Sequence, residues 1–462
     1  MKTCFRLTTA QYAALKSHLI KGDGLESVSL ALCGIRCSDQ QVIITINEVV
    51  DVPDDSCSLR SADAVRWPVE IAIPLFTKAL RRGMAVVKVH SHPRGFDRFS
   101  TQDDNSDSIL YRALRNMADD QFLFGSAFIV PDGKLSARIY GIDDHPRPVD
   151  RVSIVGDVVQ IIDRETTAAQ PNDEATLRTR QAFGEATTSL LRRLTVGVVG
   201  CSGTGSWIVE MLGRLNVGRL ILVDPDVVEG KNLNRIVNST ADDAEKAQPK
   251  PIVLARAVMA MGMNTYVETY LTDLDNREAV LALAKCDFLF GCVDSADGRD
   301  ALNRIAIFYL VPFLDIGVRL DADGKGGIRQ ITAALHYLLP GGSTLLTRGV
   351  ITAQQVSDHA LWRTDRARYE SLKAEGYVHG VAVDSPAVVS INGFVASHAV
   401  NEMLARLHPF RVDDNAEYRH QVFSLTEGIW VRVPDDCAAC EYFGRKVGRG
   451  DCRPLIENPA IK

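Results

Sequence analysis

The sequence contains no run of 18 or more uninterrupted apolar residues, so we expect neither a membrane-spanning helix nor a membrane partner. It has no excess of positive charge either: 52 Lys and Arg against 58 Asp and Glu give a net charge of -6, which does not favour nucleic acid as a partner. Its 10 cysteines in 462 residues are not a secreted disulfide framework, and the N-terminal segment MKTCFRLTTAQYAALK lacks the apolar core of a signal peptide. These absences indicate a cytoplasmic protein.

The residue pattern divides the chain into four regions. Residues 1–150 mix short β-like runs with two helical stretches, an α+β pattern. Residues 151–180 are expected to form a linker and dimer-contact segment, because their polar stretch RETTAAQPNDEATLRTR contains a Pro-Asn-Asp turn. Residues 181–435 alternate strands and helices, which predicts an α/β domain with a doubly wound, Rossmann-like parallel sheet. Residues 436–462 form a tail that contains cysteines.

A glycine-rich turn, VVGCSGTGS, follows the first strand of the α/β region and contains Gly200, Gly203 and Gly205. Glycines let the backbone turn tightly and approach a phosphate, and the helix that follows supplies free N–H groups and positive dipole charge. By itself this turn is also typical of a dinucleotide site or of a tight strand–helix connection.

Charged residues after the turn distinguish an adenylation site from a dinucleotide site. Asp224 closes the run RLILVD, where a carboxylate can accept hydrogen bonds from a ribose. Arg235 and Lys250 follow, in NLNR and QPK. A hydride-transfer enzyme does not need two cations at the phosphates, which disfavours an NAD-dependent oxidoreductase. An enzyme that adenylates a carboxylate does need them, because negative charge builds on the triphosphate during attack. Asp294 closes the run CVD at the sheet edge, where Mg²⁺ would need a carboxylate.

This order of motifs, from about Arg180 to Arg319, resembles the ubiquitin-activating family, including the ThiF/MoeB-type enzymes that adenylate sulfur carriers in thiamin and molybdopterin synthesis. The resemblance implies ATP and Mg²⁺ as cofactors, a homodimer, and activation of the C-terminal carboxylate of a small ubiquitin-like protein. It implies that the glycines Gly200, Gly203 and Gly205 cradle phosphate, that Asp224 holds the ribose, that Asn232, Arg235 and Lys250 contact the phosphates, that Asp294 binds magnesium, and that Arg180 reaches into the partner subunit's site.

A second motif, HSHP, follows the strand-like run AVVKV in the first region. His90 and His92 point to the same side of an extended chain, so both imidazoles can reach one metal ion. Asp103 could complete a three-ligand set that leaves a fourth position for water, the pattern of catalytic zinc. Two histidines alone would more often be ordinary surface residues.

The extended pattern, HSHP followed by Ser100 and Asp103, resembles the JAMM metallopeptidases, which cleave peptide and isopeptide bonds of ubiquitin-like proteins. The resemblance covers most of residues 1–140 and implies a zinc ion held by His90, His92 and Asp103. It also implies that Ser100 helps to hold the oxyanion and that a Glu on an early strand is the general base. Glu26 is our choice, although it stands eight residues before Gly34 where the family commonly has seven. Glu48 is the alternative.

The α/β region departs from its family after Pro340-Gly341. Thr344 and Thr347 stand where many relatives carry Cys-x-x-Cys, which puts a thioester intermediate in doubt. The chain could stop at the acyl-adenylate, transfer it directly, or use Thr344 or Thr347 to form an oxyester, for which no activating base is evident. Cys437, Cys440 and Cys452 are too few for the usual four-ligand zinc site.

Together the two resemblances predict a bifunctional enzyme of a bacterial ubiquitin-like conjugation pathway, with a carrier enzyme as a further partner and antiviral defence as its setting. The peptidase would expose or release the C-terminus that the second domain activates. Two alternatives stay open: activation of a sulfur carrier for cofactor or cysteine synthesis, and a first domain that only docks the modifier without zinc.

Overall fold

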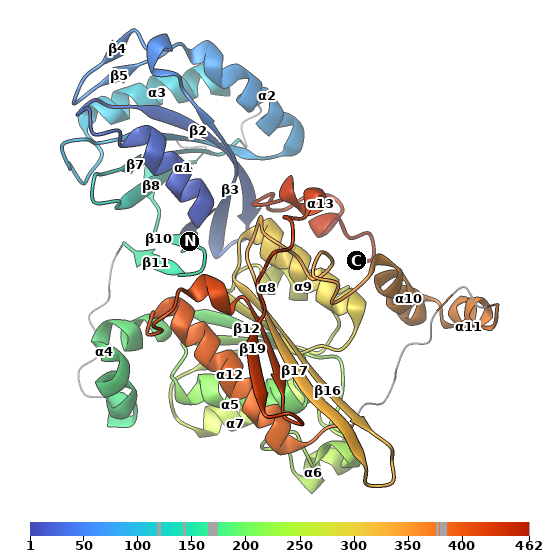
Figure 1. Cartoon of the computed structure of the whole chain (residues 1–462). Coiled ribbons are helices and arrows are strands. Elements are labelled where there is room, and N and C mark those ends of the chain that lie inside the picture. The colour runs from blue at the N-terminus through green and yellow to red at the C-terminus, as the bar shows by residue number, and fades with distance from the viewer. Residues whose placement is uncertain (118–121, 142–144, 165–173, 376–377, 379–385, 462) are drawn as a thin grey trace. The chain divides into compact units, whose positions relative to one another are not determined.

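The computed structural model describes residues 1–117, 122–141, 145–164, 174–375, 378 and 386–461 (Figure 1). The chain forms two compact units. The first comprises Met1–Thr167, Ile307–Leu310 and Tyr442–Glu457, and the second comprises Ala168–Ala306, Val311–Glu441 and Asn458–Lys462. Among the described helices, none combines the length and the hydropathy needed to cross a bilayer.

The first unit is built on a nine-stranded mixed sheet in the order β11-β10-β1-β3-β2-β6-β7-β8-β9. Its strands are β1 (Lys2–Thr8), β2 (Val28–Cys37), β3 (Gln41–Asp51), β6 (Ala85–Ser91), β7 (Phe124–Ile129), β8 (Leu135–Tyr140), β9 (Pro146–Pro148), β10 (Arg151–Val155) and β11 (Gln160–Asp163). A separate two-stranded ribbon pairs β4 (Leu59–Arg60) with β5 (Val65–Arg66). Its helices are α1 (Thr9–Leu19), α2 (Ala72–Arg82) and α3 (Thr101–Arg115).

Alternating side chains give this sheet two apolar faces. One core cluster contains Leu15 and Leu19 of α1 together with inward residues of β1, β2 and β3. The other contains Phe76 of α2 and Leu110 of α3 on the opposite face. Figure 1 shows α1 on one side of the sheet and α2 and α3 on the other. The α+β pattern predicted for this region therefore corresponds to a three-layer arrangement.

The first unit extends beyond the boundary that we expected at residue 150. Strand β10 pairs in parallel with β1, and β11 pairs with β10, so residues 151–163 are sheet rather than linker. The polar stretch that suggested a linker begins only at residue 164, and its residues 165–173 lie outside the described part of the chain. The linker prediction failed for 151–163 because the partner strand lies about 150 residues earlier, beyond the reach of a local pattern.

The expected separate tail at 436–462 also differs from the structure. Residues Tyr442–Glu457 belong to the first unit, where the Gly448 carbonyl accepts hydrogen bonds from Gly34 N at 3.2 Å and from Thr45 Oγ1 at 2.9 Å. A Cβ at Gly34 would lie 2.3 Å from the backbone of Arg449, so only glycine permits this approach. The segment therefore packs on the sheet instead of forming an independent tail.

The second unit confirms the predicted doubly wound domain. Its strands run in the order β14-β13-β12-β15-β16-β17-β18-β19, with β12 to β16 parallel and the last three antiparallel. They are β12 (Thr195–Val199), β13 (Arg219–Val223), β14 (Tyr266–Tyr270), β15 (Phe288–Gly291), β16 (Phe313–Ala322), β17 (Ile328–Leu338), β18 (His420–Ser424) and β19 (Ile429–Arg432). The helices are α4 (Leu177–Leu191), α5 (Gly203–Arg214), α6 (Ala241–Glu245), α7 (Lys250–Ala260), α8 (Arg277–Leu283), α9 (Ala296–Tyr309), α10 (Ala353–Thr364), α11 (Arg366–Ala374) and α12 (Val389–Leu407), and the short α13 (Glu441–Gly444) begins at the unit's end.

The strand order reverses between β12 and β15, which places a topological switch point there. In open parallel sheets, ligands bind outside the carboxyl ends of the strands at this point. The glycine turn follows β12, and Asp294 follows β15. The fold therefore brings the two predicted parts of the nucleotide site to the same edge.

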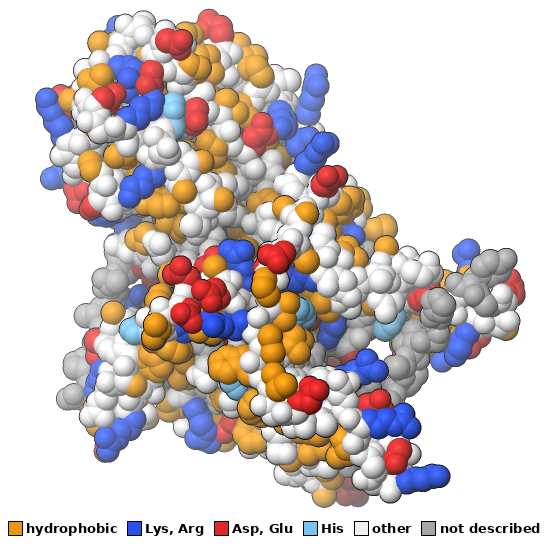
Figure 2. All heavy atoms as spheres, in the orientation of Figure 1, with side chains coloured by type: hydrophobic (Ala, Val, Ile, Leu, Met, Phe, Trp, Pro, Cys, Tyr) orange, Lys and Arg blue, Asp and Glu red, His pale blue; other side chains and the backbone are white. Residues whose placement is uncertain are grey.

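Strand β19 forms an open edge of this sheet and carries exposed hydrophobic side chains. Trp430 is 53% exposed, and its neighbours Ile429 and Val431 are also exposed. Figure 2 shows hydrophobic side chains on the visible surface over this strand. An edge strand with an exposed apolar surface is typical of a protein contact.

Candidate functional sites

The glycine turn of the second unit is closely packed against its surroundings. Gly200 has φ +89°, and a Cβ on it would lie 2.4 Å from the Cys292 carbonyl oxygen. A Cβ on Gly203 would lie 2.1 Å from Asn392 Nδ2, and one on Gly205 would lie 1.8 Å from the Gly200 carbonyl oxygen. Gly200 and Gly205 are therefore required by backbone contacts, and Gly203 by its contact with the Asn392 side chain unless that side chain moves.

Asp224 fastens this turn from the end of β13. Its side chain is 5% exposed, and its oxygens accept hydrogen bonds from Cys201 N at 2.6 Å and Asp226 N at 2.8 Å. Burial raises the pKa of Asp224, and the nearby Lys250 ammonium opposes the rise. A carboxylate oxygen has a second lone pair, so these contacts leave Asp224 able to accept from a ribose hydroxyl as well.

Two cations lie at the same edge. Lys250, buried at the start of α7, places its Nζ 2.7 Å from Asp226 Oδ2 and 3.8 Å from Asp224 Oδ1. The Cδ of Arg235 lies 3.5 Å from the position that a Cβ on Gly203 would take, so this side chain borders the turn. Lys250 is therefore connected to the glycine turn through Asp224, whereas the Arg235 guanidinium donates to the Lys231 carbonyl at 2.8 Å.

The other predicted nucleotide residues have distinct positions. The Oδ1 of buried Asn232 accepts a hydrogen bond from Glu229 N at 3.0 Å, so here it shapes its own loop. Asp294 is exposed just after β15, two residues beyond the Cys292 carbonyl that packs on the glycine turn. Arg180 lies on α4, where its Nε is 3.6 Å from Glu185 Oε2. The role expected for Arg180 requires a second copy of the chain.

The turn that contains Thr344 and Thr347 is closed by its own hydrogen bonds. Thr344 Oγ1 accepts from Thr347 N at 3.2 Å, and Thr347 Oγ1 accepts from Thr344 N at 2.8 Å. The Thr344 side chain is 2% exposed. A nucleophilic hydroxyl needs access and an adjacent base, so these contacts describe Thr344 as a turn-forming residue, and the oxyester considered for Thr344 or Thr347 stays untested.

Hydrogen bonds also tie this turn to the cysteine-containing segment. Arg348 donates to Ser343 Oγ at 2.9 Å and to Asp435 Oδ2 at 2.7 Å, and Cys440 N donates to the Gly342 carbonyl at 3.3 Å. Cys437 is exposed, and Cys440 is buried. In the described residues, the one group of at least three His, Cys, Asp or Glu donors close enough to share a metal ion lies elsewhere. Hydrogen bonds from Arg348 and Cys440 therefore join this turn to the segment that contains Asp435 and the cysteines.

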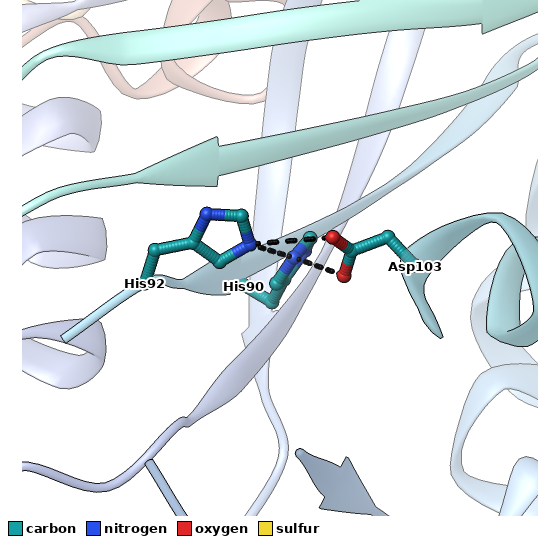
Figure 3. A group of neighbouring side chains, drawn as sticks. All are labelled: His90, His92 and Asp103. Atoms are coloured by element: carbon teal, nitrogen blue, oxygen red, sulfur yellow. Dashed lines mark hydrogen bonds and ion pairs between the residues drawn. The ribbon is translucent and has the colours of Figure 1, made fainter. Parts of the chain in front are cut away.

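That group is His90, His92 and Asp103 of the first unit. Figure 3 shows the three side chains turned toward one another, with His90 on β6, His92 directly after that strand, and Asp103 in the first turn of α3. His90 Nε2 lies 3.0 Å from His92 Nε2 and 2.8 Å from Asp103 Oδ1, and all three side chains are buried. Two imidazole nitrogens and one carboxylate oxygen that converge in this way fit a zinc ion.

Backbone and side-chain contacts orient these donors. His92 Nδ1 lies 2.7 Å from the Phe96 carbonyl, so it donates there and directs the Nε2 lone pair toward the group. Burial lowers the pKa of His90, which keeps that imidazole neutral as a ligand must be. Burial alone would raise the pKa of Asp103, but the adjoining rings of His90 and His92 hold this pKa well below its usual range.

Glu26 faces this group because of strand register. Val28 of β2 pairs with His90 of β6, and Ser91 N donates to the Ser27 carbonyl at 3.1 Å, so continuation of the register sets Glu26 opposite His92 on the same face. Glu26 is 6% exposed, and burial raises its pKa to about 7. A carboxylate with such a pKa suits a general base near neutral pH.

The two other predicted residues differ from expectation. Ser100 is the N-cap of α3, and its Oγ donates to Asp103 Oδ2 at 2.8 Å. In this structure Ser100 therefore orients the proposed metal ligand Asp103 and is not free to bind an oxyanion. Glu48 pairs with Leu32 of β2, four residues along from Val28, or roughly 13 Å. Its carboxylate forms an ion pair with Lys78. Glu48 is therefore not placed to serve as the base.

Parts of this chain are similar to known proteins. The family model described as ThiF family matches residues 176–436. Ubiquitin-like modifier-activating enzyme 5 of Drosophila willistoni is 26% identical over 187 residues, which are 37% of this chain and 43% of that protein. Adenylyltransferase and sulfurtransferase MOCS3 of Danio rerio is 30% identical over 124 residues, 27% of each chain. A crystal structure of E. coli MccB with succinimide, 15% identical, covers 61% of this chain and 77% of that chain with a TM-score of 0.44. The chain spans less than half the length of these two curated relatives.

Proposed function

Because the chain belongs to the ThiF family, we propose that its second unit uses ATP and Mg²⁺ to adenylate the C-terminal carboxylate of a small ubiquitin-like protein. The observation that carries this proposal is the buried Lys250 ammonium, which pairs with the carboxylates of Asp226 and Asp224 at the glycine turn. A carboxylate oxygen bonds to the α-phosphorus, and the bond to pyrophosphate breaks. The Lys250 ammonium offsets the negative charge that builds during this step, and Asp294 would hold the magnesium ion.

The test compares two lysines of one segment. Lys250→Ala removes the buried cation, whereas Lys246→Ala removes an exposed lysine that pairs with Asp242. Wild type and Lys246→Ala should convert a candidate small protein to its acyl-adenylate, seen as added AMP in the intact mass, and Lys250→Ala should not. Asp294→Asn, on an exposed residue, should lose the same product without loss of folding. Equal yields from all four proteins would refute the proposal.

The partners follow from the same chemistry. A homodimer would let Arg180 act in the second subunit's site, and the exposed edge strand β19 offers a surface for a protein substrate or carrier enzyme. The name of the MOCS3 relative favours sulfur-carrier activation as the alternative. Transfer to a protein lysine would support conjugation, and a terminal thiocarboxylate on the small protein would support the alternative.

For the first unit we propose a JAMM-type zinc peptidase that trims or releases the same small protein. His90, His92 and Asp103 would hold the ion, which when bound lowers the pKa of a coordinated water. Glu26 would accept the proton of that water and pass it to the leaving amine. The convergence of three buried donors with a buried carboxylate opposite them supports this proposal.

Two glutamates of the first unit provide the test. Glu26→Gln should retain about one zinc per chain, since Glu26 is not a ligand, but lose cleavage of a ubiquitin-like protein with a C-terminal extension. Glu48→Gln should retain both properties. Zinc binding without cleavage by wild type would leave a zinc-dependent docking module, and loss of cleavage in Glu48→Gln alone would refute the assignment of the base.

A further inference from the structure

A buried ion network lies beside the donor group on the same face of the sheet. Lys88 Nζ pairs with Asp107 Oδ1, and Arg138 Nη2 lies 2.7 Å from Asp107 Oδ2. Tyr140 donates to the same Asp107 oxygen at 3.0 Å, and Lys88 Nζ lies 3.3 Å from Ser106 Oγ. Asp107 is 0% exposed and Lys88 4% exposed, so these charges are removed from water.

The ion network connects the same strand and helix that carry His90 and Asp103. Lys88 precedes His90 by two residues on β6, so the two side chains share a face. Asp107 follows Asp103 by four residues on α3, so these two side chains also share a face. The ion pair Lys88–Asp107 therefore joins the same strand to the same helix as the contact between His90 and Asp103.

A second connection reaches the other histidine through aromatic rings. The Arg138 guanidinium lies 3.8 Å from the centroid of Phe99, which contacts Phe128 edge-to-face at 4.8 Å. Phe128 stacks on the His92 ring at 4.4 Å with an interplanar angle of 12°. Arg138 thus links Asp107 to the ring that fixes one face of His92.

We propose that Lys88, Asp107 and Arg138 are positioning residues that hold β6 and α3 at the separation at which His90, His92 and Asp103 can share a metal ion. This inference rests on the proposed zinc site of the first unit. Two cations around one buried anion would repel a nearby metal ion by charge alone. If the network favours metal binding, it must do so through geometry, as outer contacts of metal sites commonly do.

The test measures zinc affinity of the full chain by competition with a chromophoric chelator. Asp107→Asn and Lys88→Met should each weaken zinc binding, by no more than the roughly 10- to 100-fold that follows loss of a group bonded directly to a metal ligand. Asp104→Asn is the matched control, because Asp104 also pairs with Arg138 but is 56% exposed, and it should bind zinc as wild type does. Circular dichroism without metal establishes that each variant is folded.

Cobalt substitution separates positioning from general stability. If the network sets ligand geometry, the visible bands of the Co²⁺ protein should shift in Asp107→Asn and Lys88→Met and remain unchanged in Asp104→Asn. Should Asp107→Asn fail to fold, Lys88→Met still decides, because Asp107 there retains Arg138 and Tyr140. Tighter zinc binding by Lys88→Met would mean that charge dominates and would overturn the proposal.

The other outcomes are also decisive. Wild type that binds zinc, with variants of equal affinity and identical cobalt spectra, overturns the positioning role and leaves the zinc site standing. Wild type that binds neither metal overturns the proposed peptidase and this inference together. Weaker zinc binding with altered cobalt spectra in both variants supports the zinc site and the positioning role of the network.

Discussion

Substitution of Gly205 by alanine should close the proposed nucleotide site. A Cβ at this position would lie 1.8 Å from the Gly200 carbonyl oxygen, a backbone atom that cannot rotate away. Since a carbon–oxygen contact needs about 3.3 Å, the turn must move by roughly 1.5 Å. Such overpacking costs about 1–3 kcal/mol. If ATP binds only the turn in its wild-type conformation, this cost lowers the affinity for ATP roughly 5- to 150-fold.

The assay is titration with ATP and Mg²⁺, with Gly230→Ala as the control. A Cβ on Gly230 meets no heavy atom within 4 Å, so this variant should bind ATP as wild type does. Alanine also favours a helix over glycine by about 1 kcal/mol, so α5 should persist in Gly205→Ala and the loss should appear in binding rather than in folding. Wild-type ATP affinity in a folded Gly205→Ala protein would refute this account of the turn.

Three further outcomes are expected. Thr344→Val should cost about 1 kcal/mol of stability through its lost hydrogen bond yet retain acyl-adenylate formation, and loss of a base-labile adduct in this variant alone would restore the oxyester. If Arg180 acts in the partner's site, Arg180→Ala and Lys250→Ala should each be inactive, and their mixture should recover about a quarter of wild-type activity, since half of the dimers hold one complete site; no recovery would contradict the shared site. Burial lowers the pKa of His336 to about 2, so below pH 6.5 the unfolded chain takes up a proton that the folded chain does not. The free energy of unfolding therefore decreases as the pH falls below 6.5. Denaturant unfolding of His336→Gln at pH 7 and pH 5 should therefore show about 2 kcal/mol less acid destabilisation than wild type, whereas equal losses would contradict the burial argument; the raised pKa of Asp315 acts in the opposite sense in both proteins and cancels.

Short-range patterns predicted most of the second unit and the donor group. The glycine turn, Asp224 and Lys250 follow strands or open helices, and parallel topology then brings such positions to one edge without further information. His90 and His92 share a face because they lie two residues apart on a strand. Their approach to Asp103 additionally required α3 to begin at Ser100, and the capping pattern of Ser100 and Asp103 signals that start.

Long-range pairing could not be predicted in the same way. Strands β10 and β11 join the sheet through β1, and the segment Tyr442–Glu457 packs against Gly34 although about 400 residues separate them. The position of Glu26 depends on the register between β2 and β6, which no local signal states. Its spacing from Gly34 therefore could not distinguish it securely from Glu48.

The ion network could not be predicted from the sequence for a different reason. Lys88 in a strand and Asp107 in a helix are each ordinary residues, and only their burial and mutual contact give them meaning. A signal did exist, since a lysine is rare in an otherwise apolar strand run such as AVVKV. The sequence alone does not say which residue would neutralise it.

The central claim is that this chain activates a terminal carboxylate with ATP, and ATP–pyrophosphate exchange tests it most directly. With a candidate small protein that ends in a free carboxylate, labelled pyrophosphate should enter ATP only when Mg²⁺ is present. The same protein with an amidated C-terminus should support no exchange, because its terminal group cannot attack the α-phosphorus. Exchange that is equal for both forms, or release of ADP in place of AMP, would contradict the claim.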